Sequence, residues 1–129
     1  MGAGIMLLCG DKTLILKRAN YKHDKFSGFW NFPGGQAEPN ESSYETALRE
    51  TLEETQIDSG QYKIVNHIDT KIYTMYVAIC EEEITPTLDH EHIDWKWVEY
   101  KKIPSIKDKL HPKDWRSFKI YFKDYQTWK

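Results

Sequence analysis

The stretch GGQAEPNESSYETALRETLEETQI, residues 34–57, decides how this chain is organised. It starts with two glycines after a proline, crosses a short polar loop and then carries good helix formers to Gln56. Ser42 and Glu45 have the spacing of a capping box, in which each side chain bonds the backbone N–H of the other residue. The sequence therefore predicts a helix that begins after Ser42 and runs to Gln56.

One face of this helix is expected to pack on the protein core. At about 100° per residue, its apolar side chains fall on one side as a stripe: Tyr44, Ala47, Leu48 and Leu52. Such a stripe is typical of an amphipathic helix that covers a core.

The other side of the helix carries three carboxylates at the spacing that makes side chains neighbours: Glu50, Glu53 and Glu54. Carboxylates this close repel one another at neutral pH unless a positive charge lies between them. A hard divalent cation with oxygen ligands, Mg²⁺ or Mn²⁺, is the natural occupant. Arg49 lies beside the cluster, where its guanidinium can orient or neutralise a carboxylate. Glutamates on a helix usually form only a solvated face, so the surrounding pattern has to decide.

That pattern resembles the signature of the Nudix hydrolases. The matching residues are Gly35, Glu41, Arg49, Glu50, Glu53 and Glu54, with Ile57 closing the segment. Six fixed residue types at average usage match a given start by chance roughly once in 10⁷. The chain departs from the family at Thr51, where an aliphatic residue is usual, and at Gln56, where Gly is usual. Gln56 must either adopt the left-handed cap with some strain or end the helix differently.

The resemblance implies a single Nudix domain over residues 1–129. Its fold would be α/β (α+β), an α-β-α sandwich with a mixed β-sheet between helices. Its activity would be metal-dependent hydrolysis of the pyrophosphate bond in a nucleoside diphosphate derivative, which releases a nucleoside monophosphate. The expected metal ligands are the carbonyl of Gly34 and the carboxylates of Glu50, Glu53 and Glu54. Glu41 and Arg49 would brace this constellation.

Two acids compete for the role of general base. Glu50 is one, but a carboxylate held against a cation has a lowered pKa and is a better ligand than base. A second acid is therefore expected on the acidic connector of residues 81–92. Glu91 is favoured, because EHIDWKWV resembles a Glu-x₅-Trp-Val run of the family. The predicted catalytic residues are thus Glu50, Glu91 and Arg49.

Zinc is not expected in this connector. His90 and His92 alternate as residues on a strand do, and the sequence offers no evident third ligand.

Substrate contacts are expected where strands and loops approach the signature. Lys17 and Arg18 end a predicted strand and are either a phosphate clamp or a solvated strand end. The loop of residues 19–29 adds Phe26, which can contact a base. Tyr73 either stacks on a base, as in the dinucleoside polyphosphate branch of the family, or is a core tyrosine, which is favoured. The choice of nucleotide stays open.

The remaining elements are read from local pattern. Strands are expected at residues 3–9, 13–18, 61–69, 71–80 and 93–99. A final helix starts near Pro112, with aromatic residues at helical spacing that are expected to pack on the core: Trp115, Phe118, Phe122 and Tyr125.

Composition limits the partners. The formal net charge of −2 offers no long-range attraction for a polyanion, so no stable nucleic-acid partner is expected. No secretory or membrane segment is recognisable. Cys9 and Cys80 lie in apolar runs and read as reduced thiols, which fits the cytoplasm. The aromatic residues of 115–128 fit either a homodimer interface or a packed terminal helix.

Two other functions compete with a nucleotide hydrolase. An enzyme that removes the 5′ triphosphate or cap of RNA would use the loop lysines, but the chain has no basic stripe. A non-catalytic nucleotide sensor would not need the complete set of acids that the signature keeps.

Overall fold

The structure is a computed structural model that describes residues 1–123. Its central strand is β1 (Gly2–Cys9), which pairs in parallel with β6 (Tyr73–Ile79). β1 turns back antiparallel into β2 (Lys12–Arg18) through Gly10, which has a φ of 59°. Glycine suits this turn because it adopts left-handed conformations without a steric penalty.

The sheet has seven strands and mixes parallel and antiparallel pairs. Its main order is β3 (Trp30–Asn31), β2, β1, β6 and β5 (Lys63–Asp69). β7 (His92–Glu99) pairs with β2, and the short β4 (Gly34–Gln36) pairs with the first residues of β1. The mixed sheet that the sequence predicted is confirmed.

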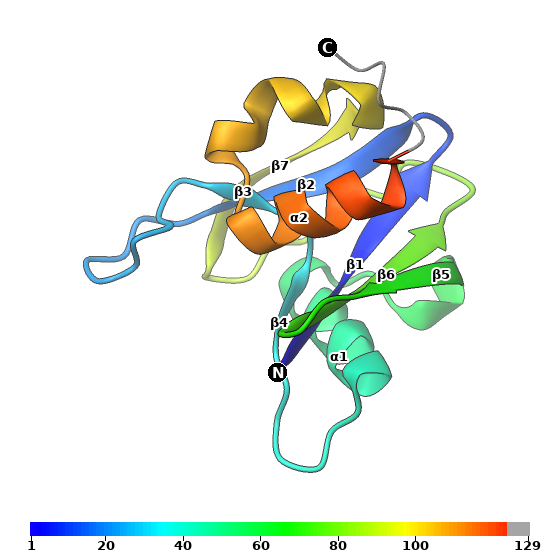
Figure 1. Cartoon of the computed structure of the whole chain (residues 1–129), viewed down its shortest axis with the longest axis horizontal. Helices are drawn as coiled ribbons and strands as arrows, with labels where there is room; N and C mark the ends of the chain where they lie inside the picture. Colours follow the sequence, from blue (N-terminus) through cyan, green and yellow to red (C-terminus); the bar gives the residue numbers. More distant parts are fainter. Residues whose placement is uncertain (124–129) are drawn as a thin grey trace.

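Two α-helices lie on opposite faces of this sheet (Figure 1). α1 (Ser43–Thr55) covers the face to which Ala3, Ile5 and Leu7 of β1 point. α2 (Pro112–Tyr121) covers the other face, where Met6 packs with Phe118. Two 3₁₀ segments, η1 (Ser59–Gln61) and η2 (Tyr100–Lys109), complete the described chain. The layers form the predicted α-β-α sandwich.

The apolar stripe predicted for α1 is confirmed for Ala47, which is buried, and for Leu48, which packs on the core, but it is wrong for Tyr44 and Leu52. Tyr44 and Leu52 are 47% and 42% exposed, and the helix instead buries a mostly small, polar face: Thr46, Ala47, Thr51, Glu54 and Thr55. The threonines can be buried because two of their hydroxyls bond to helix carbonyls one turn earlier, at 2.9 and 2.6 Å. Thr51, which departs from the family pattern, is fully buried on the core side as predicted, and its hydroxyl has no hydrogen-bond partner among the described residues.

The strand predictions are confirmed with small shifts of their ends, and the helix does start at Pro112. The sequence missed β3, β4 and η2, which are too short or too irregular to show a periodic pattern. Phe118 and Phe122 are core residues as predicted. Tyr125 and the rest of the aromatic tail lie outside the described residues.

Candidate active site

The site begins with the way α1 is capped. Ser42 Oγ accepts the Glu45 N–H at 3.1 Å, and Glu45 Oε1 accepts the Ser42 N–H at 2.9 Å, as the capping box predicted. At the other end Gln56 adopts the left-handed cap with a φ of 62°, where the family usually has Gly. The first of the two predicted endings, a strained cap, is therefore the one that the structure adopts.

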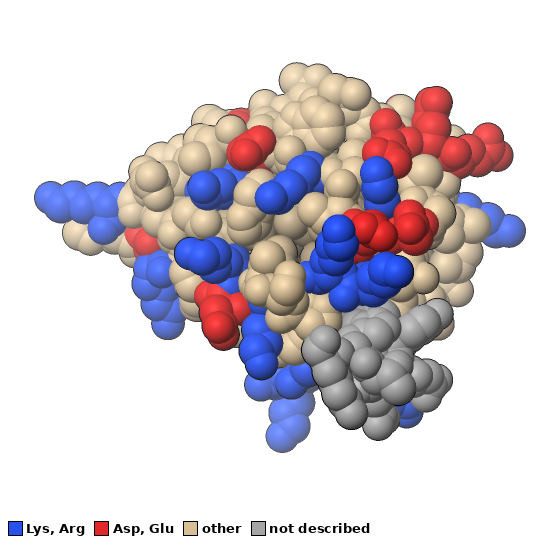
Figure 2. Space-filling view, turned by 90° about the horizontal axis from the view of Figure 1, so that it is seen from above, with Lys and Arg blue, Asp and Glu red and all other residues tan. Residues whose placement is uncertain are grey.

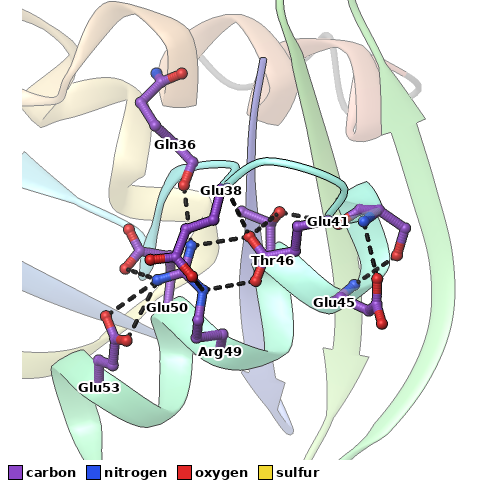
Figure 3. Close-up of polar contacts among 9 residues, drawn as sticks. Gln36, Glu38, Glu41, Glu45, Thr46, Arg49, Glu50 and Glu53 are labelled. Carbon is purple, nitrogen blue, oxygen red and sulfur yellow. Dashed lines mark hydrogen bonds and ion pairs between the residues drawn. The ribbon is translucent and has the colours of Figure 1, made fainter.

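Arg49 is the hub of the acidic face (Figure 3). Its guanidinium makes a two-pronged contact with Glu41, at 2.6 and 2.9 Å. Nη1 lies 3.2 Å from an oxygen of Glu50 and from one of Glu53, and Nη2 donates to the carbonyl of Gln36 at 3.0 Å. One side chain thus fixes three carboxylates relative to one another, which is the bracing role predicted for Arg49.

Glu41 is the anchor of this network. Arg49, the N–H of Glu38 and the hydroxyl of Thr46 all donate to its carboxylate. These hydrogen bonds, with that of Arg49 the strongest, lower the pKa of Glu41 to about 2. Glu41 is therefore charged at neutral pH, and it keeps Arg49 in place.

Glu50 lies against the glycine loop. A side chain at Gly35 would collide with the Glu50 carboxylate, so glycine is needed there for close approach. Burial raises the pKa of Glu50 to about 7, with further contributions from Glu53 and Glu91 that outweigh the opposing charge of Arg49. A bound cation would relieve this repulsion.

Glu54 also contacts the glycine loop, from a buried position. It is 3% exposed, and its Oε1 accepts the backbone N–H of Gly34 at 3.0 Å. Burial raises its pKa well above the ordinary value, and the negative charges of Glu50, Asp89 and Glu91 raise it further. Glu53, in contrast, is exposed. The three glutamates therefore do not share one solvated face, because α1 is rotated toward burying Glu54.

A group of metal-ligating side chains that the sequence did not predict includes Glu54. Oxygens of Glu54 and Asp89 and a ring nitrogen of His92 all lie within 4.8 Å of one another. His92 Nδ1 is 2.9 Å from Asp89 Oδ1, and the imidazole is buried with no hydrogen-bond partner for Nε2 among the described residues. The partners missed in sequence are thus Asp89 and Glu54, three and 38 residues from His92. Asp89 lies in the acidic connector where a second acid was expected, but nothing in the local pattern indicates that Glu54 joins it and His92.

Glu91 lies at the edge of this group. Its side chain is exposed, its N–H donates to Asp89 Oδ1 at 3.2 Å, and its carbonyl accepts the N–H of Ala19. The charge of Glu91 raises the pKa values of Glu50 and Glu54, so it lies on the side of the site predicted for the second acid. A carboxylate oxygen of Asp89 lies within 4.8 Å of one of Glu54, so Asp89 is a second candidate for the general base.

The donor set fits a hard divalent cation. Burial, and after it the neighbouring carboxylates, raise the pKa values of Glu50 and Glu54. The oxygens of Glu50, Glu53, Glu54 and Asp89 match the ligands of Mg²⁺ and Mn²⁺. The single imidazole of His92 is acceptable to Mn²⁺. The set has too few nitrogen and sulfur donors for a typical zinc site.

The predicted phosphate clamp is engaged with other partners. Arg18 Nη2 forms an ion pair with Asp24 at 2.6 Å and its Nε donates to the same oxygen at 3.1 Å. Lys17 Nζ lies 6.0 Å from the centre of the Trp30 ring, whose environment also includes Lys96 at 4.7 Å. A substrate phosphate would have to compete with Asp24 for Arg18.

Phe26 lies in a small aromatic cluster. Its ring is 4.1 Å from that of His111 and 5.4 Å from that of Phe29, between ring centres. Half-buried Phe26 therefore joins the loop of residues 19–29 to the start of α2. Its expected contact with a base stays a prediction.

Tyr73 is a core residue, and its predicted contact with substrate is wrong. It is 1% exposed and its hydroxyl fits against Gly4 and Gly34, where added side chains would collide with it. A ring this buried cannot stack on a base. The core reading, which the sequence favoured, is the one that the structure confirms.

The thiols and the described helices add two facts. Cys9 and Cys80 are both free, the first half-buried and the second buried, as their apolar surroundings predicted. Within residues 1–123, none of the helices has both the length and the apolar character needed to cross a membrane.

Comparison with known proteins defines the class. A family model described as NUDIX domain matches residues 1–122. The asymmetrical bis(5′-nucleosyl)-tetraphosphatase of Sus scrofa is 33% identical over 97 residues, which cover 66% of this chain and 62% of that protein. The Caenorhabditis elegans protein of the same name is 27% identical over 119 residues, covering 82% and 83%. An 8-oxo-dGTP diphosphatase of Proteus vulgaris is 34% identical over 68 residues, covering 53% and 59%.

Solved structures agree on the fold. A C. elegans Ap4A hydrolase superposes with a TM-score of 0.76 at 22% identity, over 98% of this chain and 99% of that one. The Nudix hydrolase RenU of M. smegmatis gives 0.82 at 20% identity, over 98% and 85%. The chain belongs to the Nudix hydrolases, enzymes that act on phosphoanhydride bonds. Both the family and the fold predicted from residues 34–57 are confirmed.

Proposed function

We propose that this protein hydrolyses the pyrophosphate bond of a nucleoside diphosphate derivative and releases a nucleoside monophosphate. The observation that carries the proposal is the convergence of Glu50 and Glu54 on the adjacent glycines Gly35 and Gly34, with Arg49 fixing Glu50 and Glu53. Acids gathered at a glycine loop bring cation ligands close to backbone that has no side chains in the way.

Mg²⁺ or Mn²⁺ would be held by Glu50, Glu53 and Glu54 and by the carbonyl of Gly34, with Asp89 as a further oxygen donor. When bound, the cation would neutralise phosphate charge and favour attack by water. Arg49 holds the carboxylates in place, and Gly34 and Gly35 let the backbone approach the phosphates. Glu50, Glu91 and Asp89 are the candidates to accept a proton from water, and a cation held by Glu50 would lower the pKa of that carboxylate and favour the other two.

A dinucleoside polyphosphate is the substrate we propose to test first, because two of the relatives are named for that activity. A modified nucleoside triphosphate is the second, on the evidence of the shorter match to an 8-oxo-dGTP diphosphatase. Arg18 and Lys17 would contact phosphates, and Phe26 would contact a base.

An RNA 5′-end hydrolase is the main alternative. Residues 94–123 hold nine Lys or Arg and four Asp or Glu, so this part of the chain is basic although the whole is not. Figure 2 shows basic and acidic side chains interspersed on the face seen from above, and Lys102 pairs with Glu99 at 3.1 Å. Such a mixed surface favours a small nucleotide over a long polyanion.

The test is a substrate panel with Mg²⁺ and, separately, Mn²⁺, run in ¹⁸O-labelled water. It would contain diadenosine tetraphosphate, 8-oxo-dGTP, dGTP, ADP-ribose, a nucleotide sugar, coenzyme A and 5′-triphosphorylated RNA. Hydrolysis of the first should give AMP and ATP, with the label showing which phosphorus water attacked. Preferred cleavage of RNA would support the alternative, and tight nucleotide binding without any cleavage would support a sensor.

The same class of substrate also bears on the location and partners of the protein. We propose a cytoplasmic protein without a stable nucleic-acid partner, consistent with free thiols at Cys9 and Cys80. A homodimer is the proposed assembly to test, by light scattering of the purified chain.

A further inference from the structure

The segment Phe32–Pro33–Gly34, which joins β3 to β4, is held from three directions. The N–H of Phe32 donates to Asp114 Oδ2 at 3.1 Å, and the N–H of Gly34 donates to Glu54 Oε1 at 3.0 Å. Between them, the carbonyl of Pro33 accepts the N–H of Ile5 in β1 at 2.9 Å. The two carboxylates come from α2 and α1, which lie on opposite faces of the sheet.

Asp114 is a carboxylate in a fully buried position of α2, which is unusual. It is 0% exposed, and its Oδ1 has no hydrogen-bond partner among the described residues. Among residues 1–123, the cation within ion-pair distance of Asp114 is Lys113, whose Nζ lies 3.5 Å from Oδ2. A buried carboxylate with one unpaired oxygen lowers stability relative to an apolar side chain of the same size. Packing of α2 on the core therefore does not explain it.

Ser117 gives an internal comparison. It lies one turn after Asp114 on the same helix, is also fully buried, and its Oγ also has no partner among the described residues. It has no hydrogen bond to the segment 32–34. The feature that distinguishes Asp114 is its contact with the backbone two residues before Gly34, 82 residues away in sequence.

The α2 side of the segment is also covered, by Tyr73 and Lys113. The Tyr73 hydroxyl lies against Gly34 on the α2 side, and Lys113 Nζ lies 5.0 Å from the centre of the Tyr73 ring. Buried Asp114 and Tyr73, with half-buried Lys113 beside them, thus lie between α2 and the loop that carries the expected metal-binding carbonyl.

We propose that Asp114 is a positioning residue for the carbonyl of Gly34. α2 fixes the start of the segment through Asp114 while α1 fixes its end through Glu54, so the carbonyl is aimed by both helices. The inference rests on the proposed function, because it takes the Gly34 carbonyl as a cation ligand. Mg²⁺ tolerates little deviation from octahedral geometry, so small movements of one ligand weaken binding.

The experiment compares Asp114→Ala with Asp114→Asn and Ser117→Ala in the full chain. Mn²⁺ affinity is measured by electron paramagnetic resonance, and hydrolysis of the preferred substrate gives kcat and KM separately. Loss of an outer-shell partner weakens metal binding about 10- to 100-fold. We expect that loss for Asp114→Ala, together with a fall in kcat. Asp114→Asn keeps an oxygen that can accept the Phe32 N–H and should restore affinity to within about threefold, and Ser117→Ala should match wild type.

Hydrogen exchange supplies a readout that is independent of activity. The Phe32 amide should exchange faster in Asp114→Ala and stay protected in Asp114→Asn and Ser117→Ala. If Asp114→Ala does not fold, Asp114→Ser, whose hydroxyl is too short to reach Phe32, takes its place with the same expectation.

Different results would overturn the proposed function and the role of Asp114. Wild-type protein that neither binds Mn²⁺ nor cleaves any nucleotide would overturn the proposed function and this inference with it. Wild-type protein that does both, with Asp114→Ala equal to Ser117→Ala in Mn²⁺ affinity, would overturn only the role of Asp114.

Discussion

The two helices meet the same sheet through opposite kinds of surface. α1 packs on β1 with small side chains, chiefly Thr46, Ala47 and Thr51. α2 covers the other face with aromatic rings, among which Phe118 and Phe122 lie 4.7 Å apart between ring centres. Each helix nevertheless sends one buried carboxylate to the segment of residues 32–34.

The two kinds of helix surface serve different purposes, ligand placement on α1 and stability on α2. Small side chains bring the backbone of α1 close to the sheet, so the ligands that it carries are placed by short and stiff contacts. Aromatic rings bury much apolar area, so α2 contributes more of the free energy of unfolding. Changes on α1 should therefore affect chemistry more than stability, and changes on α2 should do the reverse.

The largest effect is expected from Glu54→Gln on α1. The amide keeps an oxygen for the Gly34 N–H but loses the charge that a cation needs, so turnover should fall by about 10³-fold or more while the fold stays intact. Steady-state kinetics and circular dichroism would check this. Glu45→Gln, on the same helix but in the capping box, is the control. Normal turnover by Glu54→Gln would refute the metal assignment.

The next effect is on stability. Phe118→Ala on α2 should lower the free energy of unfolding by about 3–5 kcal/mol, because a buried ring leaves a cavity. Leu52→Ala on α1 should lower it by less than about 1 kcal/mol, since Leu52 is exposed. Urea denaturation measures both. Equal losses would mean that α1 packs by its apolar stripe after all, and the contrast between the helices would disappear.

A smaller effect concerns pH and Glu50. Its pKa is raised to about 7 in the folded protein from an ordinary 4.5, so between these values the folded state holds a proton that the unfolded chain lacks. Stability from this group is present at low pH and is lost as pH rises through 7. Metal-free wild type should therefore gain about 1 kcal/mol relative to Glu50→Gln on going from pH 8 to pH 6.

Thermal melts of both proteins in EDTA and in Mg²⁺ measure this difference. His111 has the opposite effect of pH on stability. Burial lowers the pKa of His111 to about 4, so acid favours the unfolded state through this residue. His111 is present in both proteins, so its contribution cancels. Saturating Mg²⁺ should reduce the difference, and a difference unchanged by Mg²⁺ would place the cation away from Glu50.

The smallest effect is at the end of α1. Gln56→Gly should raise the free energy of unfolding by about 0.5 kcal/mol, because the left-handed cap strains an L-residue by more than glycine loses in entropy. Gln56→Ala removes the side chain without relieving the strain and is the control. A loss of stability in Gln56→Gly would show that the Gln56 side chain stabilises the cap.

Much of this could be predicted from residues 34–57, because their chemistry is local. The capping box joins residues three apart, and the Arg49 network joins residues within one loop and one helix. The rotation of α1 could not be predicted in this way. Burying Tyr44 and Leu52 would require a different rotation of α1 from the one that lets Glu54 accept the Gly34 N–H. Only the folded chain shows that α1 adopts the rotation that buries Glu54.

The parts of the site that were missed depend on distant partners. Asp89 and His92 meet Glu54 only when the connector of residues 81–92 folds back onto α1. Asp114 reaches Phe32 across 82 residues. Tyr73 was ambiguous because an aromatic residue in a strand has the same local pattern whether it faces a core or a ligand.

The parallel pairing of β1 with β6 also has a consequence for synthesis. β1 is synthesised well before the strand that covers one of its edges, because that strand is Tyr73–Ile79. Until β6 has been synthesised, that edge of an apolar strand remains open to pairing with other nascent chains. Folding that waits for such long-range contacts is slow compared with that of a helical bundle of equal length. The nascent chain is therefore a natural client for chaperones that shield β1 until β6 emerges.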